Sequence, residues 1–159
     1  MKAIPLTQGY IAVVDDDDWR ILRRWKWCVQ VHGERAYALR RSSDGIVWMH
    51  RQIVCAPKHL FVDHINGDGL DNRRENIRLA TKRQNSQNMV RKRPNKTSRF
   101  KGVSKSQHHN GWRATIKVNG ARIHLGYFKD ESDAARAYDA AAIEHFGPFA
   151  APNEREPNE

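Results

Sequence analysis

The 159-residue sequence has only two cysteines, Cys28 and Cys55, and no long apolar segment. Two thiols cannot build a four-thiolate zinc site or a disulfide framework, so zinc fingers and cysteine-stapled secreted domains are excluded. No apolar run approaches the roughly 18 residues that cross a bilayer. The opening residues, MKAIPLTQGY, lack the apolar core of a secretory signal. We therefore expect a cytoplasmic protein with no membrane partner.

Acidic residues are nearly absent from one stretch at mid-chain, residues 73–101. It holds 11 of the 28 Lys and Arg residues but only one of the 18 Asp and Glu residues, Glu75. The remaining 17 positive and 17 negative charges cancel, so the whole formal net charge of +10 lies in this stretch. Solvated faces usually mix signs, and one-signed clustering favours contact with phosphates. A polyanionic partner is expected, and a small-molecule substrate is not.

The segment from about residue 4 to residue 60 has the pattern of a small α+β scaffold. Tyr10–Val14 is short, apolar and β-branched, which predicts a strand. Four aspartates, Asp15–Asp18, then precede a run rich in arginine, and this order suits a helix start better than a metal site. Further strands are expected around Val29 and at residues 37–41 and 46–54, with a hairpin turn at residues 42–45.

The middle segment, residues 61–89, predicts a strand, loop, strand and helix. Phe61–Ile65 and Ile77–Ala80 are short strand-like runs, and the loop between them is rich in glycine, aspartate and asparagine. Thr81 followed by Gln84 has the spacing of a capping box, so a helix begins there. Asn85 falls on its first full turn.

This unit is expected to bring Asp63, His64 and Asn85 together. Carboxylate and amide oxygens suit a hard divalent ion, Mg²⁺ or Mn²⁺, and leave coordination positions for phosphate and water. A neighbouring histidine titrates near neutral pH and can take a proton from that water.

Three sequence words in this segment closely resemble HNH endonucleases of the phage and intron homing type: DHING from Asp63, DNRRENIR from Asp71 and QNSQN from Gln84. The resemblance implies the ββα-metal fold and metal-dependent nicking or cutting of DNA. It implies that His64 is the general base, that Asp63 and Asn85 hold a single metal ion, and that Asn76 bonds across the loop and orients the histidine. Asn88 is a less certain ligand.

Two other histidines precede the motif. His50 also occurs in similar proteins, and we interpret it as structural; His59 receives no role. Zinc-stapled members of the family use cysteine pairs outside the hairpin, and this chain has none, so no zinc is expected. The residues before 60 must support the hairpin by packing instead.

The C-terminal segment alternates in the manner of a half-buried antiparallel sheet. Apolar Trp112, Ala114 and Ile116 alternate with polar side chains, and Asn119-Gly120 predicts a type I′ hairpin turn. A helix is expected after Asp130, rich in alanine and ended by Gly147 and Pro148. One face of the sheet would be apolar and the other basic, with a width that fits the DNA major groove.

The words KGV from Lys101, WRA from Trp112, LGYF from Leu125 and AARAYDAA from Ala134 strongly resemble the APETALA/ethylene-response DNA-binding domain, over about residues 98–153. The resemblance implies a three-stranded sheet that contacts DNA through Lys101, Ser104, Ser106, Thr115, Lys117, Arg122 and His124. Serines replace the arginines common at 104 and 106, and His124 replaces a tryptophan. Arg113 and Lys105 are candidates to compensate, and the plant target sequence is not carried over.

The sequence therefore predicts an HNH nuclease domain at 1–89 with its metal core at 61–89, and a basic linker at 90–99 in which Arg91, Lys92 and Arg93 contact DNA. A DNA-binding domain at 100–153 and a disordered tail at 154–159 follow. The expected function is a homing-type, nicking endonuclease on double-stranded DNA, in the bacterial host cytoplasm if phage-encoded. The alternatives are a non-catalytic sequence-specific DNA-binding regulator and, less favoured, an RNA-directed enzyme.

Overall fold

The computed structural model describes residues 1–88, 97–107 and 109–153. The chain forms two compact units, residues 1–85 and 86–159, each with its own sheets and helices. The mixture of helix and strand confirms the expected α+β class. The predicted tail, 154–159, and most of the predicted linker lie outside the described residues. No helix in the parts that the structure describes has the length and apolar character to cross a membrane.

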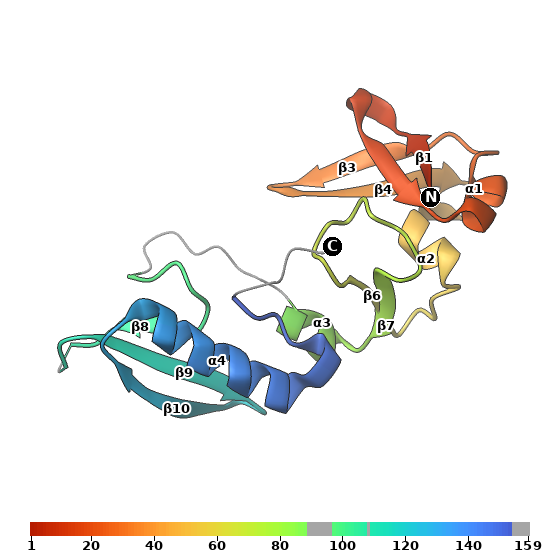
Figure 1. The fold of residues 1–159 in the computed structure, drawn as a ribbon. Coiled ribbons are helices and arrows are strands. Elements are labelled where there is room, and N and C mark those ends of the chain that lie inside the picture. Colours follow the sequence, from red (N-terminus) through yellow and green to blue (C-terminus); the bar gives the residue numbers. More distant parts are fainter. Residues whose placement is uncertain (89–96, 108, 154–159) are drawn as a thin grey trace. The chain divides into compact units, whose positions relative to one another are not determined.

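The chain begins with an antiparallel pair of strands, β1 (Lys2–Pro5) and β2 (Ile11–Val14), joined through a short 3-10 turn, η1 (Thr7–Gly9). The strand predicted at residues 10–14 is thus confirmed, whereas β1 was not expected from the sequence. Helix α1 (Asp16–Leu22) follows, with Asp15 at its N-cap and three aspartates in its first turn. The four aspartates therefore start a helix, as predicted (Figure 1).

A second sheet holds β3 (Cys28–His32), β4 (Arg35–Ser42) and β5 (Gly45–Trp48) in antiparallel order. The expected turn at residues 42–45 joins β4 to β5. The strand predicted at 46–54 is wrong beyond Trp48, because the chain turns there into helix α2 (Met49–Ile53). Met49, His50 and Ile53 are buried at a helical spacing, and packing of this face overrides the β-branched composition.

The next elements match the predicted strand, loop, strand and helix. Strand β6 (Phe61–His64) pairs antiparallel with β7 (Ile77–Ala80), and helix α3 (Lys82–Asn88) follows. The Thr81 backbone N–H donates to Gln84 Oε1 at 2.8 Å, and the Gln84 N–H donates to Thr81 Oγ1 at 3.3 Å, which confirms the capping box.

One hydrophobic core joins these elements in the first unit. It gathers buried side chains from β1, β2, α1, β3, β4, α2 and β7: Ile4, Leu6, Ala12, Val14, Leu22, Trp27, Val29, Ala38, Met49, Ile53 and Ile77. Because Ile77 belongs to β7, this core packs the hairpin onto the scaffold.

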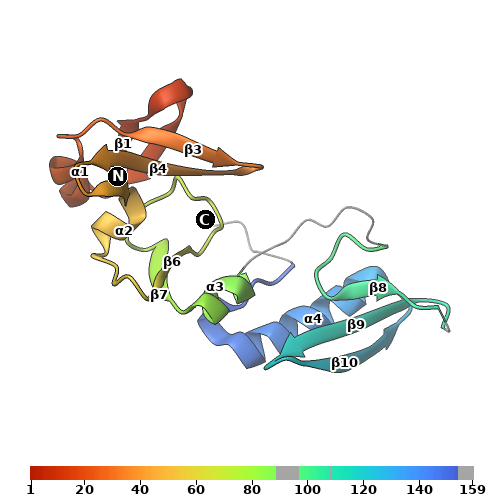
Figure 2. The ribbon, with the colours of Figure 1, turned by 180° about the vertical axis from the view of Figure 1, so that it is seen from behind.

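The second unit is a three-stranded antiparallel sheet covered on one face by a helix (Figure 1 and Figure 2). The strands are β8 (Val103–Lys105), β9 (Trp112–Val118) and β10 (Ala121–Phe128), with β9 in the middle. Asn119 and Gly120 both have positive φ, 53° and 88°, as the predicted type I′ turn requires. Helix α4 (Glu131–Phe146) ends at Gly147, where η2 (Gly147–Phe149) begins.

Small residues let α4 lie close to this sheet. Ala134, Ala135 and Ala142 are fully buried against β8 and β9, in two clusters that also contain Ile116 and Tyr138. Helix α4 thus covers the apolar face of the sheet, and most side chains of the polar face are exposed.

Candidate active site

Asp63 and His64 lie at the end of β6, where the hairpin opens into its loop. Their relative exposures are 4% and 6%, so both side chains are removed from bulk water. In the strand register Asp63 faces Arg78 and His64 faces Ile77. The hairpin therefore places both residues at the end of β6, next to the loop.

The loop from residue 65 to residue 76 is held by its own side chains. Asn66 Oδ1 accepts from the Asp68 N–H at 2.8 Å, and Asp68 Oδ1 accepts from the Leu70 N–H at 2.9 Å. Asn76 spans the loop: its Oδ1 accepts from the Asn66 N–H at 3.0 Å, and its Nδ2 donates to the Asp71 carbonyl at 2.7 Å. Asn76 thus bonds across the loop as expected, to backbone groups.

The same loop is tied to the scaffold at two places. Backbone hydrogen bonds join Val13 of β2 to the loop, from its N–H to Leu70 and from the Asn72 N–H to its carbonyl. Arg74 makes a bidentate pair with Asp18 of α1, both bonds being 2.8 Å. Asp18 therefore starts a helix and also anchors the loop of residues 65–76, a second role that its position in the sequence did not reveal.

The Asn72 side chain contacts the imidazole of His64. Its Oδ1 lies 3.4 Å from His64 Nε2, and its Nδ2 donates to the Leu70 carbonyl at 3.1 Å, which fixes the direction of the amide. Because an amide oxygen only accepts, Nε2 carries the proton in the neutral ring. In that tautomer the lone pair of the ring lies on Nδ1.

Burial lowers the pKa of His64 below its ordinary value, against the opposing effects of Asn72 and the carboxylates of Asp63, Asp68 and Asp71. The imidazole is thus neutral at pH 7 and competent as a base. An uncharged ring is the state that a general base needs before it receives a proton.

Aromatic rings enclose His64 on the side of the scaffold. The ring centroid of Tyr37 lies 5.9 Å from that of His64, and His50 lies 5.2 Å away, edge to face. His50 also stacks on Trp48 at 6.0 Å. Sequence reasoning missed Asn72 and Tyr37; the Asp-Asn pair at 71–72 was the available signal for the first, and nothing in the spacing indicates the second.

His50 is buried, and none of the groups that influence its pKa favours the charged form of the ring. Its relative exposure is 9%, its Nδ1 has no hydrogen-bond partner, and burial lowers its pKa to about 3. The sequence interpretation as a structural residue agrees with its packing, but its position against His64 was not foreseen.

Replacing His50 by Phe is expected to make stability less dependent on pH. A histidine whose pKa is depressed by folding contributes its full stability above the unfolded value of about 6.5, and loses about 1.4 kcal/mol per pH unit below it, toward the folded pKa of about 3. The free energy of unfolding, measured with urea between pH 6.5 and 4.5, should change less with pH in His50→Phe than in the wild type. The pH dependence that is left should come from His64. Exposed His59→Phe is the control; parallel profiles for wild type and His50→Phe would contradict the assignment.

The oxygen ligands expected for a metal ion fit a hard divalent cation in kind, but one of them has a competing partner. Asp63 Oδ2 accepts from Arg78 Nε at 2.9 Å and from Nη2 at 2.7 Å. Asn85 is half-buried on α3. No three His, Cys, Asp or Glu side chains gather into a metal site within residues 1–88, 97–107 and 109–153. An ion at Asp63 would share that carboxylate with Arg78.

The exposed face of the C-terminal sheet carries most of the residues expected to contact DNA. In the register Arg122 faces Lys117, His124 faces Thr115, and Ser104 faces Arg113, so these six side chains share one face. Tyr127 joins them across from Arg113, with its ring 4.6 Å from that of His124. A β-bulge between His124 and Gly126 permits this placement.

Two of the expected lysines lie elsewhere. Lys101 Nζ donates to the Gln87 carbonyl at 2.8 Å and lies 5.9 Å from the Tyr138 ring of α4. Lys105 faces Trp112 in the register, with its Nζ 5.1 Å from that ring, on the side that α4 covers. Arg91, Lys92 and Arg93 lie outside the described residues.

Known proteins resemble this chain in its hairpin, in its C-terminal segment or along nearly its whole length. Residues 56–87 match the family model described as HNH endonuclease. An HNH endonuclease of Acanthamoeba polyphaga mimivirus is 35% identical over 153 residues, which cover 92% of this chain and 76% of the relative. Protein 3.8 of Escherichia phage T7 is 41% identical over 40% of this chain and 52% of its own length. A rice AP2/ERF and B3 domain-containing protein is 49% identical over 57 residues, 36% of this chain and 15% of the relative.

The mimivirus relative matches along nearly the whole chain, and the family model covers the hairpin that holds Asp63 and His64. The chain belongs to the HNH endonuclease family.

Proposed function

We propose that the protein is a metal-dependent DNA endonuclease of the homing, nicking type, directed to its target by the C-terminal sheet. The observation that carries this proposal is His64, a neutral buried imidazole oriented by Asn72 and adjacent to the Asp63 carboxylate. Family membership supports a nuclease, and the one-signed charge of residues 73–101 supports a nucleic-acid substrate.

His64 has the part of general base in the proposed mechanism. Its Nδ1 takes a proton from water as the oxygen attacks phosphorus. The bond from phosphorus to the 3′-oxygen breaks, and the leaving 3′-oxygen takes a proton from solvent water to become a hydroxyl. Asn72 Oδ1 accepts from the Nε2–H and stabilises the imidazolium that forms. A divalent ion, Mg²⁺ or Mn²⁺, held by Asp63 and Asn85 would supply electrostatic stabilisation of the charge that develops on the phosphate.

The polar face of the C-terminal sheet is proposed to hold the duplex. Arg113, Lys117 and Arg122 place three exposed cations on one face of the sheet, and β-sheets of this kind read DNA grooves. The likeness to the rice protein named for AP2/ERF and B3 domains supports this assignment. Likeness to a phage T7 protein supports a place in the cytoplasm of a bacterial host.

One observation favours a second candidate, a DNA-binding protein that does not cleave. The ion pair between Asp63 and Arg78 occupies the carboxylate on which the metal depends. If that pair persists in the presence of Mg²⁺, the hairpin binds DNA without hydrolysing it.

Incubation with supercoiled plasmid that carries the native flanking DNA separates the two candidates. We expect open-circle product in Mg²⁺ or Mn²⁺ and none in EDTA, because the phosphate charge is then unneutralised. Linear product at early times would contradict nicking. Tight, salt-sensitive binding without any cleavage in either metal would contradict the nuclease proposal and favour the non-catalytic binder.

A further inference from the structure

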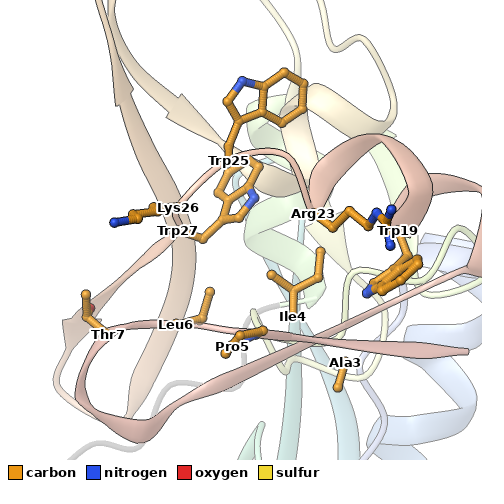
Figure 3. Close-up of a pocket in the computed structure, with 10 residues that line it drawn as sticks. All are labelled: Ala3, Ile4, Pro5, Leu6, Thr7, Trp19, Arg23, Trp25, Lys26 and Trp27. Atoms are coloured by element: carbon orange, nitrogen blue, oxygen red, sulfur yellow. The ribbon is translucent and has the colours of Figure 1, made fainter.

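A cavity of about 440 Å³ lies in the first unit. Asp63 and His64 of the hairpin do not line it. Its walls come from β1 on one side and from the segment between α1 and β3 on the other (Figure 3). The lining residues are Ala3, Ile4, Pro5, Leu6, Thr7, Trp19, Arg23, Trp25, Lys26 and Trp27. The volume falls within the range of small-molecule sites, about 300–1,000 Å³.

Three of the five tryptophans of the chain line this one cavity. Trp27 is fixed, with a relative exposure of 3% and its indole N–H donating to the Leu22 carbonyl at 2.9 Å. Trp25 meets Trp27 edge to face at 6.5 Å but remains 36% exposed. A rigid floor of Ile4 and Trp27 with an accessible indole at the rim is a surface on which a planar ring can stack.

The charge at the rim is positive. Arg23 lies 4.7 Å from the Trp19 ring, and Arg40 lies 4.5 Å from the Trp25 ring. The nearby aspartates of α1 are already paired: Asp16 with the N-terminal ammonium, Asp17 with Arg20, and Asp18 with Arg74. No ion pair joins Arg23 or Lys26 to a carboxylate in the described parts of the chain, so both cations are available to an anion.

We propose that this cavity binds an unpaired nucleotide, with the base stacked on the exposed Trp25 ring and a flanking phosphate held by Arg23. Aromatic rings interleaved with cations bind single strands because every base has a stacking face and every nucleotide a phosphate. A paired base presents only its edge, and a concave site of this size has no access to its ring faces. The identification of the nucleic acid as DNA rests on the proposed function. The nucleotide site itself is inferred from the cavity and its side chains alone.

Binding of single-stranded oligothymidylate to the full chain in EDTA tests the site without any cleavage step. We expect the oligonucleotide to quench the tryptophan fluorescence, whereas an abasic oligomer of the same length should not. Trp25→Leu should weaken binding of the single strand about tenfold and leave affinity for a duplex within about twofold, because stacking is lost while the C-terminal sheet is intact. Trp25→Tyr, which keeps a stacking ring, should retain most of the affinity.

Arg23→Gln gives an independent test because an exposed arginine is replaced without affecting the core. It should lower single-strand affinity severalfold and reduce the salt dependence of binding by about one ion. The matched control is Arg20→Gln on the same helix, whose side chain is already paired with Asp17. Wild-type affinity in both Trp25→Leu and Arg23→Gln, or equal quenching by the abasic oligomer, would overturn the proposal. Because EDTA removes the metal, failure of the nuclease proposal would not produce either result.

Discussion

Replacing His64 by Ala is expected to reduce the rate of plasmid nicking by about 10²–10⁴-fold, the range that a positioned general base contributes. The reason is structural: His64 is buried, neutral, and oriented through Nε2 by Asn72, so its Nδ1 is prepared to take the proton of the attacking water. Affinity for the same DNA should stay within about twofold, because the variant removes no cation. Gel conversion of supercoiled plasmid and fluorescence anisotropy measure the two quantities.

The matched control for this variant is His59→Ala. His59 is exposed in the turn before β6 and should leave the rate unchanged. His64→Asn is a second variant that preserves a polar group in the buried site, and thermal unfolding reports whether either change perturbs the fold. Cleavage by folded His64→Ala at the wild-type rate would contradict the assignment of the base.

Local sequence determines the parts of the fold that were predicted well. Thr81 and Gln84 cap α3 through hydrogen bonds within four residues, and Asn119 with Gly120 sets a two-residue turn through positive φ. Both signals act over short distances, so they survive whatever the rest of the chain does. The same holds for Asp63 and His64. They are the last two residues of β6, so the strand itself places them at the end of the hairpin.

The errors concern elements whose state depends on distant residues. Residues 49–53 lie within a run, 46–54, that begins and ends with β-branched residues and predicts a strand. They form α2 instead because Met49 and Ile53 complete the core of the first unit. Strand β1 is visible only through its pairing with β2. Tertiary packing outweighs local propensity at both places.

The residues that surround His64 and Asp63 could not be predicted from the sequence either. Tyr37 reaches His64 from β4, and Arg78 reaches Asp63 from the facing strand, neither at a spacing that a motif records. Such contacts are fixed by register and packing. Tyr37 and His50 pack against the His64 ring, and Arg78 pairs with the Asp63 carboxylate that we propose as a metal ligand.

Substitution of Gly102 by Ala is expected to destabilise the C-terminal unit by about 3 kcal/mol or more. Gly102 has a φ of +79°, and an added Cβ would overlap the ring of Tyr138 and come within 2.7 Å of the Thr115 carbonyl. Tyr138 is 4% exposed between α4 and the sheet, so it has no space into which to move. The backbone around Thr115 is equally constrained, since its N–H donates to the Gly102 carbonyl at 2.8 Å.

Gly120→Ala separates this packing effect from the cost of the backbone conformation. Its φ is +88°, close to that of Gly102, but a Cβ there meets nothing within 4 Å, so only about 1–2 kcal/mol should be lost. Hydrogen exchange should show Gly102→Ala losing protection in residues 97–107 and 109–153 while β6 and β7 keep theirs. Affinity for the flanking DNA should fall with it, since the polar face of Arg122 and Lys117 exists only while β9 and β10 are paired. Equal stability of the two variants would contradict close packing at Gly102; a selectively unfolded second unit with undiminished DNA affinity would show that targeting does not depend on the sheet.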